Sequence, residues 1–329
     1  MVETSDEWIR ERTGIAERHV SVGETVVTLA SEAARKALER AGKTAEEIDL
    51  ILVASCSPEQ YLPCCACQVQ AAIGAVNALA FDVNAACSGF LFALNTADAY
   101  LRTGLAENAL VIGSEVLSKL VDWTDRGSCI LFGDGAGAVV VERCRTESRA
   151  VEYGNALPAA EEKRIPAAGI LGRALHSDGT GGGVLQCGAR ELTTPYARTS
   201  AAKTDQNQPT DGREHYIQMD GQEVYRFATR RVPQCIEEAL SDAGLTVPDI
   251  DLFVLHQANA RIIDAVAKRL HADRDKFPTN LERVGNMSSA SIPVLLDELN
   301  RQRKLHRGDR IVLAGFGAGL TIGACVMTW

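Results

Sequence analysis

The sequence predicts an α/β protein built from two copies of one unit. The first observation is an internal repeat, in which segment 37–50 reads like segment 239–252 at a constant offset of 202 residues. The second is that a glycine-rich turn and an apolar strand close each copy, at 131–141 and at 314–322. The third is the alternation of apolar strands with amphipathic helices, which is typical of mostly parallel sheets covered by helices.

Length and composition agree with this prediction. The chain has 329 residues, with 46% hydrophobic and 23% charged residues. This length suits two domains or one duplicated domain, and the composition excludes general disorder, a collagen-like chain and a small disulfide scaffold. The formal net charge of −9 argues against a nucleic-acid partner, because an acidic surface repels a phosphate backbone.

Both ends of the sequence indicate a cytoplasmic protein. Residues 1–7 are acidic and polar and do not read as a signal peptide. The ten cysteines are therefore expected to stay reduced, without a disulfide framework. Residues 311–329 carry no charge over nearly the length of a membrane span, but four glycines interrupt them. Two buried strands around a glycine turn fit better than a membrane segment.

The two repeat copies predict the same order of elements. In each, a helix with small apolar residues ends at a glycine, Gly42 in the first copy and Gly244 in the second. A short acidic loop follows, and then an apolar strand at 51–53 or 253–255.

Later in the first copy, a strand at 80–84 leads into Cys87, and an apolar helix follows directly. A cysteine at the start of a helix lies at the positive end of the helix dipole, which stabilises a thiolate. Small neighbours leave room for a substrate carbonyl. Cys87 is thus a candidate nucleophile, and a buried structural cysteine is the alternative.

The middle of the chain differs from both copies. Segment 143–212 contains the glycine run 179–183 and a polar stretch typical of loops. We therefore divide the chain into a first half at 1–142, a connecting insertion at 143–212 and a second half at 213–329. The insertion is expected to be exposed or to pack over a site.

Two polar residues of the second half complete a candidate site. The strand of the second copy runs into His256, where the first copy has Ala54. Under the repeat offset Cys87 falls opposite Ser289, so that Asn286 lies close to the counterpart of the cysteine. A structural histidine and a helix-capping asparagine are the alternatives. Cysteine, histidine and asparagine brought together by pseudo-symmetry are a more specific signal than any one of them.

Taken together, six short motifs resemble β-ketoacyl-acyl-carrier-protein synthase III. They are TSDEWI at 4–9, RTGI at 12–15, AACSG at 85–89, GDGAG at 133–137, HQAN at 256–259 and GN at 285–286. The resemblance covers nearly the whole chain apart from segment 143–212. It implies the thiolase fold, which is a duplicated five-layer αβαβα arrangement, and a homodimer.

The resemblance also implies a reaction. Cys87 would take an acyl group from acyl-CoA, with acetyl-CoA as the expected starter, and malonyl-acyl carrier protein would enter next. His256 and Asn286 would stabilise the enolate formed by decarboxylation, which then attacks the acyl group. The backbone N–H groups of Cys87 and Ala318 would form the oxyanion hole, although the family has glycine at position 318. No cofactor is implied.

Further residues take roles from the same resemblance. Trp8 and Arg126 would sandwich the adenine of coenzyme A, with Arg12 near its phosphates. Phe316 would act as a gate beside the nucleophile. Leu62 stands where relatives often have a phenylalanine that reaches across the dimer to shape the acyl pocket.

Acyl carrier protein is acidic, so this acidic chain needs a local basic surface to bind it. Four basic residues match the docking positions of the family: Arg226, Arg261, Lys268 and Arg269. A solvated helix face is the alternative for each.

Three features depart from the family or mimic other sites. By the resemblance, the given sequence begins at a point that is interior in the family, after the usual first strand. The cysteines at 64–67 resemble metal ligands, but no histidine or second cysteine pair lies close in sequence. The motif at 133–137 lacks the lysine of a phosphate loop. We expect no metal site.

Three alternative functions stay open at this point. One is a ketosynthase III-like enzyme of secondary metabolism with a different starter. A hydroxymethylglutaryl-CoA synthase-like activity is weaker, since it needs a glutamate base for which no motif is found. The third is a non-catalytic scaffold that binds acyl carrier protein, against which the joint presence of Cys87, His256 and Asn286 argues.

Overall fold

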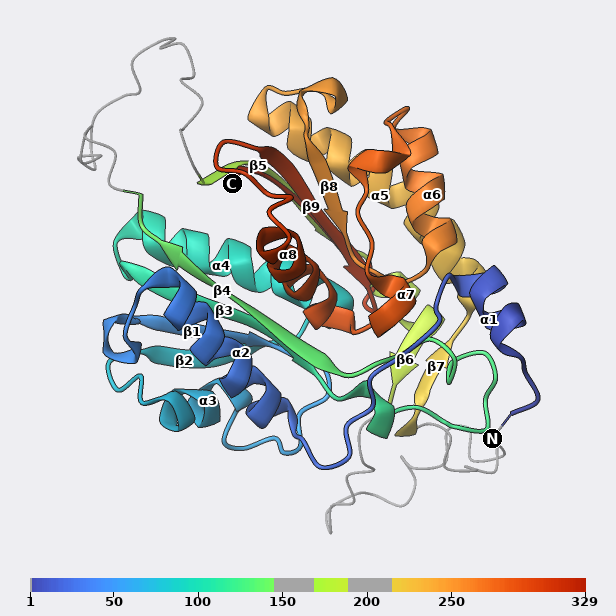
Figure 1. Ribbon diagram of the computed structural model, residues 1–329, viewed down its shortest axis with the longest axis horizontal. Coiled ribbons are helices and arrows are strands. Elements are labelled where there is room, and N and C mark those ends of the chain that lie inside the picture. The colour runs from blue at the N-terminus through green and yellow to red at the C-terminus, as the bar shows by residue number, and fades with distance from the viewer. Residues whose placement is uncertain (1, 145–168, 189–214) are drawn as a thin grey trace, which may run out of the picture.

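The computed structural model describes residues 2–144, 169–188 and 215–329. Within these ranges, two four-stranded sheets alternate with three layers of helices (Figure 1). The strand order is β2-β1-β3-β4 in the first sheet and β5-β10-β9-β8 in the second. The predicted α/β fold with a duplicated αβαβα arrangement is confirmed.

The first sheet holds the strands of the first repeat copy. They are β1 (Leu50–Ala54), β2 (Leu79–Val83), β3 (Asn108–Glu115) and β4 (Gly135–Glu142). β1 pairs in parallel with β2 and β3, and β4 runs antiparallel to β3. All five residues of β1 are buried, as expected for a central parallel strand.

The second sheet consists of β5 (Gly169–Ser177), β8 (Leu252–Leu255), β9 (Arg310–Gly317) and β10 (Thr321–Thr328). β8 is parallel to β9, and β10 is antiparallel to both β9 and β5. The uncharged C-terminal stretch therefore forms two strands around a glycine turn, as the sequence predicts. Among the described residues, no helix has the length and apolarity needed to cross a membrane.

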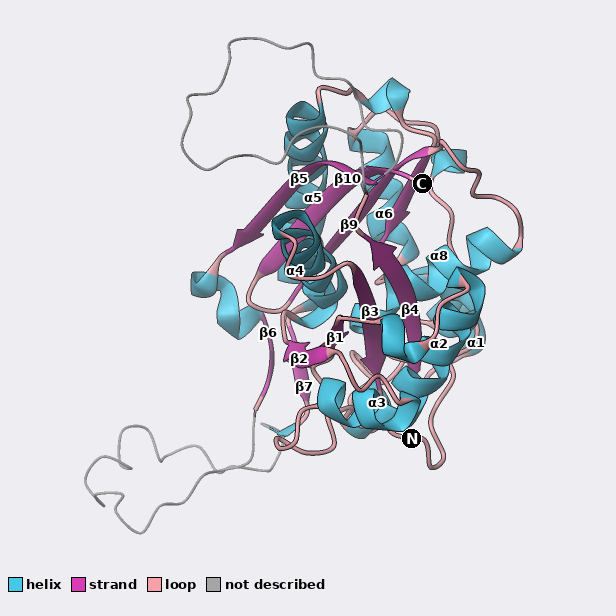
Figure 2. Cartoon of the chain, turned by 90° about the vertical axis from the view of Figure 1, so that its left-hand side faces the viewer, coloured by secondary structure: helices cyan, strands magenta, loops and turns pink. Residues whose placement is uncertain are grey.

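The helices form the other three layers (Figures 1 and 2). α2 (Val26–Ala41) and α3 (Cys65–Ile73) cover the outer face of the first sheet. α5 (Gly221–Ala243) and α6 (Ala260–Arg269) cover the outer face of the second. α4 (Gly89–Thr103) and α8 (Ser291–Arg301) lie between the sheets and share one core with both. The apolar face of each helix therefore defines one of the layers.

Four short elements lie outside the layers. They are the helices α1 (Asp6–Thr13) and α7 (Leu281–Val284) and the strands β6 (Leu185–Cys187) and β7 (Ile217–Met219). β6 pairs antiparallel with β7.

Several elements of the two halves correspond at the repeat offset of 202 residues. β3 and β9 begin and end at positions that differ by the repeat offset, and Gly42 and Gly244 end their helices with φ of 65° and 68°. The turns η2 (Ala86–Ser88) and η8 (Ser288–Ala290) also correspond. Each turn packs on the strand of the opposite half, η2 on β9 and η8 on β3. The halves thus meet where the sequence places Cys87 and Ser289.

The connecting segment differs from the expectation of an insertion. β5, at 169–177, is an edge strand of the second sheet, and β6 lies at the cavity described below. The buried and half-buried residues of β5 alternate, as in a strand packed on one face. The rest of the expected insertion, at 145–168 and 189–212, lies outside the described residues.

Candidate active site

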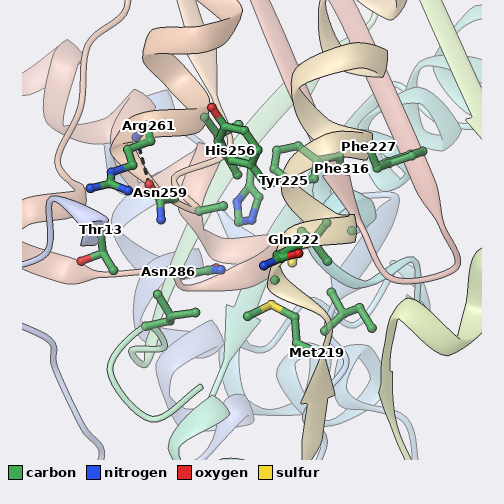
Figure 3. Close-up of a pocket in the computed structure, with 18 of the residues that line it drawn as sticks. Thr13, Met219, Gln222, Tyr225, Phe227, His256, Asn259, Arg261, Asn286 and Phe316 are labelled. Atoms are coloured by element: carbon green, nitrogen blue, oxygen red, sulfur yellow. Dashed lines mark hydrogen bonds between the residues drawn. The ribbon is translucent and has the colours of Figure 1, made fainter. Parts of the chain in front are cut away.

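A cavity of about 750 Å³ opens between the two halves at the ends of β8 and β9. Cys87, His256 and Asn286 all line it, so the structure brings together the three residues singled out from the sequence. Figure 3 shows His256 and Asn286 pointing into this space from different segments. A cavity of this size is typical of a small-molecule site.

Cys87 lies in η2, two residues before α4 begins. Its backbone nitrogen is so close to Gly317 that a Cβ atom at position 317 would lie 2.7 Å from it. Burial raises the pKa of the Cys87 thiol to about 12, although the side chain of Ser288 opposes the shift. The start of α4 therefore does not suffice to keep a thiolate, and the resting cysteine carries its proton at neutral pH.

His256 follows β8 and is held by its own backbone. Its N–H donates to the carbonyl of Ala314 on β9 at 2.8 Å, and its ring meets the ring of Phe316 edge to face with centroids 5.5 Å apart. Burial lowers the pKa of His256 to about 3, so the imidazole is neutral. Its Nδ1 has no partner among the described residues.

Asn286 is fixed by both halves of the molecule. Its backbone N–H donates to Leu131 at 2.9 Å, and its carbonyl accepts from the N–H of Gly133 at 3.0 Å. Its side-chain Oδ1 accepts from the N–H of Ser288 at 2.9 Å. Because the amide oxygen is engaged, the Nδ2 hydrogens are left as donors for a ligand in the cavity.

This arrangement suits acyl transfer. A protonated thiol, a neutral imidazole and an amide donor share one largely apolar cavity. The imidazole is able to take the thiol proton or to donate a hydrogen bond, and the amide is able to stabilise an oxyanion. Within the described part of the chain no cluster of histidine, cysteine and acidic residues fits a metal ion.

The residues expected to form the oxyanion hole and the gate lie differently with respect to the cavity, and both roles stay predictions. Phe316 lines the cavity next to His256, in the place expected of a gate. Gly317 also lines it, whereas Ala318 does not. The carbonyl of Ala318 accepts a hydrogen bond from Thr321 at 3.0 Å. The oxyanion role of the Ala318 backbone N–H stays a prediction.

The three residues expected to bind coenzyme A lie together, but Trp8 and Arg126 are too close to each other to hold an adenine between them. The guanidinium carbon of Arg126 is 4.6 Å from the ring centroid of Trp8, and that of Arg12 is 5.6 Å away. An adenine between two planar groups separates them by about 7 Å, twice a contact distance. Arg126 therefore has to move before an adenine fits against Trp8, while Arg12 already lines the cavity.

The expected acyl-pocket residue Leu62 is not brought to the cavity. Its side chain is 84% exposed and does not belong to the lining. Its predicted role depends on a second subunit and stays a prediction.

Basic residues surround one side of the mouth. Arg226 and Arg261 line the cavity, Arg226 pairs with Glu223 at 2.7 Å, and Arg261 donates to the carbonyl of Glu11 at 2.9 Å. Asn259 caps α6 by accepting from the N–H of Arg261, which Figure 3 shows as a dashed line. Lys268 and Arg269 are exposed on the last turn of the same helix.

Sequence reasoning missed part of the lining. Leu185 on β6 and Met219 on β7 line the cavity, as do Gln222, Tyr225 and Phe227 on α5. In the sequence these two short strands stand next to glycine-rich and polar stretches, so neither strand is predicted from the sequence. The apolar spacing of α5 was the available signal.

Comparisons with known proteins agree on one family. The family model 3-oxoacyl-[acyl-carrier-protein (ACP)] synthase III matches residues 81–155, and the model of its C-terminal part matches residues 240–329. Beta-ketoacyl-[acyl-carrier-protein] synthase III of Clostridium acetobutylicum is 44% identical over 329 residues, covering 100% of this chain and 92% of the relative. The Synechococcus protein of the same name is 46% identical, covering 100% of this chain and 89% of the relative.

Solved structures give the same result. The 3-oxoacyl-[acyl-carrier-protein] synthase III of Aquifex aeolicus matches with a TM-score of 0.85 at 38% identity, over 100% of this chain and 92% of that one. The priming β-ketosynthase of the R1128 polyketide biosynthetic pathway matches with a TM-score of 0.82 at 33% identity, over 99% of this chain and 89% of that one.

Proposed function

This chain is a condensing enzyme, an acyltransferase of the β-ketoacyl-[acyl-carrier-protein] synthase III family, and we propose that it initiates fatty-acid synthesis from acetyl-CoA and malonyl-acyl carrier protein. One observation carries this proposal: Cys87, His256 and Asn286, from two halves of the chain, line one cavity. The remaining steps follow from their protonation states.

In the first half-reaction Cys87 takes the acyl group. The thiol loses its proton as sulfur attacks the thioester carbonyl, and the neutral imidazole of His256 is the acceptor in the cavity. The carbon–sulfur bond to Cys87 forms, the bond to coenzyme A breaks, and the released thiolate takes the proton. Backbone N–H groups beside Cys87 stabilise the tetrahedral oxyanion.

In the second half-reaction the malonyl thioester loses carbon dioxide. Its two electrons remain on the α-carbon as an enolate, whose oxygen accepts hydrogen bonds from His256 and from Nδ2 of Asn286. The enolate carbon attacks the acyl thioester of Cys87 and forms the new carbon–carbon bond. Decarboxylation supplies the carbanion, so neutral donors suffice and no strong base is needed.

The test uses purified protein and a panel of acyl-CoAs, with intact mass and peptide mapping as the readout. We expect one acetyl adduct on Cys87 and none in Cys87→Ala. Asn286→Ala should still be acylated but should condense with malonyl-acyl carrier protein about 100-fold more slowly, as for the loss of one oxyanion donor. Unchanged condensation in Cys87→Ala would refute the catalytic role.

Acyl carrier protein is the proposed partner, and α6 with the start of α5 is its proposed dock. Arg226 and Arg261 are at the mouth, and Lys268 and Arg269 extend the positive surface along α6. This is a local basic surface on a chain of net charge −9, as an acidic partner requires.

A homodimer is the proposed assembly. β2 is an edge strand of the first sheet; its first residue, Leu79, is 53% exposed, and Val76 in the turn before it is 74% exposed. Leu62 lies near its other end, since the N–H of Cys65 donates to the carboxylate of Asp82 at 2.8 Å. An open edge rimmed by exposed apolar side chains favours pairing with a second copy.

We also propose a cytoplasmic location and acetyl-CoA as the starter. All ten cysteines are free thiols, which suits the reducing cytoplasm. A longer starter, as in a priming ketosynthase, is the second candidate because Leu62 and Ala318 depart from the family pattern and a priming ketosynthase is among the structural relatives. A longer acyl adduct on Cys87 in the panel would favour it over acetyl.

A further inference from the structure

Glu115 is a fully buried carboxylic acid to which the proposed reaction gives no part. It is the last residue of β3, and its side chain does not line the cavity. In the described part of the chain, the groups that contact its oxygens are donors. Oε1 accepts from the hydroxyl of Ser289 at 2.8 Å, and Oε2 accepts from the backbone N–H of Cys56 at 3.1 Å and from the hydroxyls of Ser55 and Ser57. Burial raises the pKa of Glu115, and these donors oppose that shift because an ionised carboxylate only accepts hydrogen bonds.

Pseudo-symmetry relates Glu115 to the active site. Under the repeat offset Glu115 corresponds to Gly317, and Cys87 corresponds to Ser289. At Gly317 the missing side chain leaves the space that the Cys87 backbone occupies. At the equivalent place in the other half, the Glu115 side chain fills the space and bonds Ser289. The duplicated fold therefore has the Cys87 backbone at one of two equivalent positions and a carboxylate side chain at the other.

A single hydroxyl joins the two places. Ser288 has a φ of 46°, a left-handed conformation that a non-glycine residue keeps only where its surroundings hold it. Its hydroxyl lies 3.9 Å from the sulfur of Cys56. The turn that holds it, η8, packs on both η2, which contains Cys87, and β3, which ends at Glu115. The Ser288 side chain also lowers the pKa of Cys87 and of Glu115, against the effect of burial. Ser288 thus lies between the nucleophile and the buried carboxylate.

We propose that Glu115 is a positioning residue for Cys87, which fixes the turn Ser288–Ser289 and so holds the Ser288 hydroxyl against the cysteine sulfur. The inference rests on the proposed function, in which Cys87 is the nucleophile. A hydroxyl in that place donates to sulfur as the thiol gives up its proton, and so eases the attack. Glu115 itself touches neither substrate nor the reacting atoms.

Two variants of Glu115 separate position from charge. Glu115→Gln loses the charge but keeps the hydrogen bonds that join position 115 to Cys56 and Ser289, because its amide oxygen still accepts from the N–H of Cys56. Its amide nitrogen donates to Ser289, whose hydroxyl turns to the carbonyl of Ala54, 2.8 Å away. Glu115→Ala loses both the charge and these hydrogen bonds.

The experiment measures the rate at which acyl-CoA acylates Cys87, in the wild type and in the background of Ser288→Ala. With Ser288 present, Glu115→Ala should be acylated at least about 10-fold more slowly than Glu115→Gln. In Ser288→Ala the two variants should react at the same rate, because no hydroxyl is left to position. An equal gap in both backgrounds would overturn the proposal.

The pH profile of Cys87 alkylation by iodoacetamide gives a readout that does not depend on acyl chemistry. Glu115→Gln should shift the midpoint to lower pH, because a negative charge near the sulfur is lost. Glu115→Ala should have a higher midpoint than Glu115→Gln, by about one pH unit, because the hydrogen bond from Ser288 is lost too. Coinciding midpoints would refute positioning. If no acyl-CoA labels the wild type, the proposed function fails, and this profile still decides the role of Glu115.

Asp49→Asn is the matched control for stability. Asp49 also ties backbone N–H groups with a carboxylate, those of Glu107 and Asn108 at 2.8 and 3.0 Å, but at the opposite end of β3. It should lower the melting temperature without moving the alkylation midpoint. Should Glu115→Ala fail to fold, Glu115→Met keeps the side-chain volume, accepts no hydrogen bond and replaces it in both measurements.

Discussion

At Gly317 one methyl group would take the space that the Cys87 backbone needs. A Cβ atom there would lie 2.7 Å from the backbone nitrogen and 3.0 Å from Cβ of Cys87. Neither neighbour is the end of a flexible side chain, so the turn carrying the nucleophile would have to shift. The position of the Cys87 backbone therefore depends on this residue, 230 positions away in the chain.

We predict that Gly317→Ala slows acylation of Cys87 by about 100-fold, the cost typical of displacing a reacting group by about 1 Å. A time course of intact mass with acetyl-CoA measures it. Gly23→Ala is the control, because a Cβ atom there meets no atom within 4 Å. Wild-type acylation in Gly317→Ala would contradict the geometry.

Burial of His256 predicts an acid-sensitive fold. Burial lowers the pKa of His256 to about 3, whereas an unfolded histidine has a pKa near 6.5. Between these values the unfolded chain binds a proton that the folded chain does not. The free energy of unfolding therefore falls as the pH drops from about 6.5 towards 3.

Urea unfolding at pH 7, 5.5 and 4.5 checks this sign. We expect His256→Gln to lose less stability over this range than the wild type, since glutamine does not titrate. Parallel losses in both proteins would show that other groups cause the acid sensitivity.

The candidate residues could be predicted from the sequence, but their protonation could not. The repeat offset placed Asn286 near the counterpart of Cys87, and the difference between His256 and Ala54 marked the histidine. The position of Cys87 before a helix favoured a thiolate, yet burial dominates and keeps the thiol protonated. Cys87 is buried because its turn packs on β9, and the sequence around Cys87 gives no sign of that distant strand.

At the scale of elements, α6 separates a packed face from a charged face. Ile262, Ile263 and Val266 lie in the core of the second half, while Lys268 and Arg269 are exposed. A surface of this kind contributes to encounter with an acidic partner rather than to the chemistry.

We predict that Lys268→Glu raises KM for malonyl-acyl carrier protein about 3- to 10-fold, the range typical of an exposed charge at the rim of an interface. Steady-state kinetics at two salt concentrations measure it. Acylation by acyl-CoA should be unchanged, because Lys268 does not line the cavity. Lys36→Glu on the exposed face of α2 makes the same charge change and should leave KM as it was.

Elements inside the repeat were easier to predict than those outside it. The helices that end at Gly42 and Gly244 and the strands that follow them have sequence signals in duplicate. β5 has no such counterpart, and it stands among glycines and polar residues that read as loop. Its partner is β10, more than 140 residues later, so its place in the second sheet depends on a contact that no local pattern carries.

At the scale of the whole molecule, the open edge of β2 predicts the assembly. Val76→Asp should weaken the dimer, because a charge in an apolar interface is costly to desolvate. Sedimentation velocity at micromolar concentration should show a shift towards monomer. Leu105→Asp is the control, at an exposed leucine beyond the end of α4. An unchanged dimer in Val76→Asp would place the interface elsewhere.

The crossing of the two halves makes the active site a property of the whole chain. Cys87 comes from the first half and packs on β9 of the second, while Asn286 of the second half is pinned by Leu131 and Gly133 of the first. Neither half alone supplies the proposed nucleophile together with the proposed hydrogen-bond donors.

The unequal residues at positions 115 and 317 also fix a stoichiometry. Two identical halves would offer two equivalent places for a bound acyl group. At one of them Cys87 lies against Gly317, and at the other Ser289 is bonded to the Glu115 side chain, so we expect each chain to carry a single acyl group at a time. The moles of label bound in the first turnover with labelled acyl-CoA should therefore equal the moles of correctly folded chain.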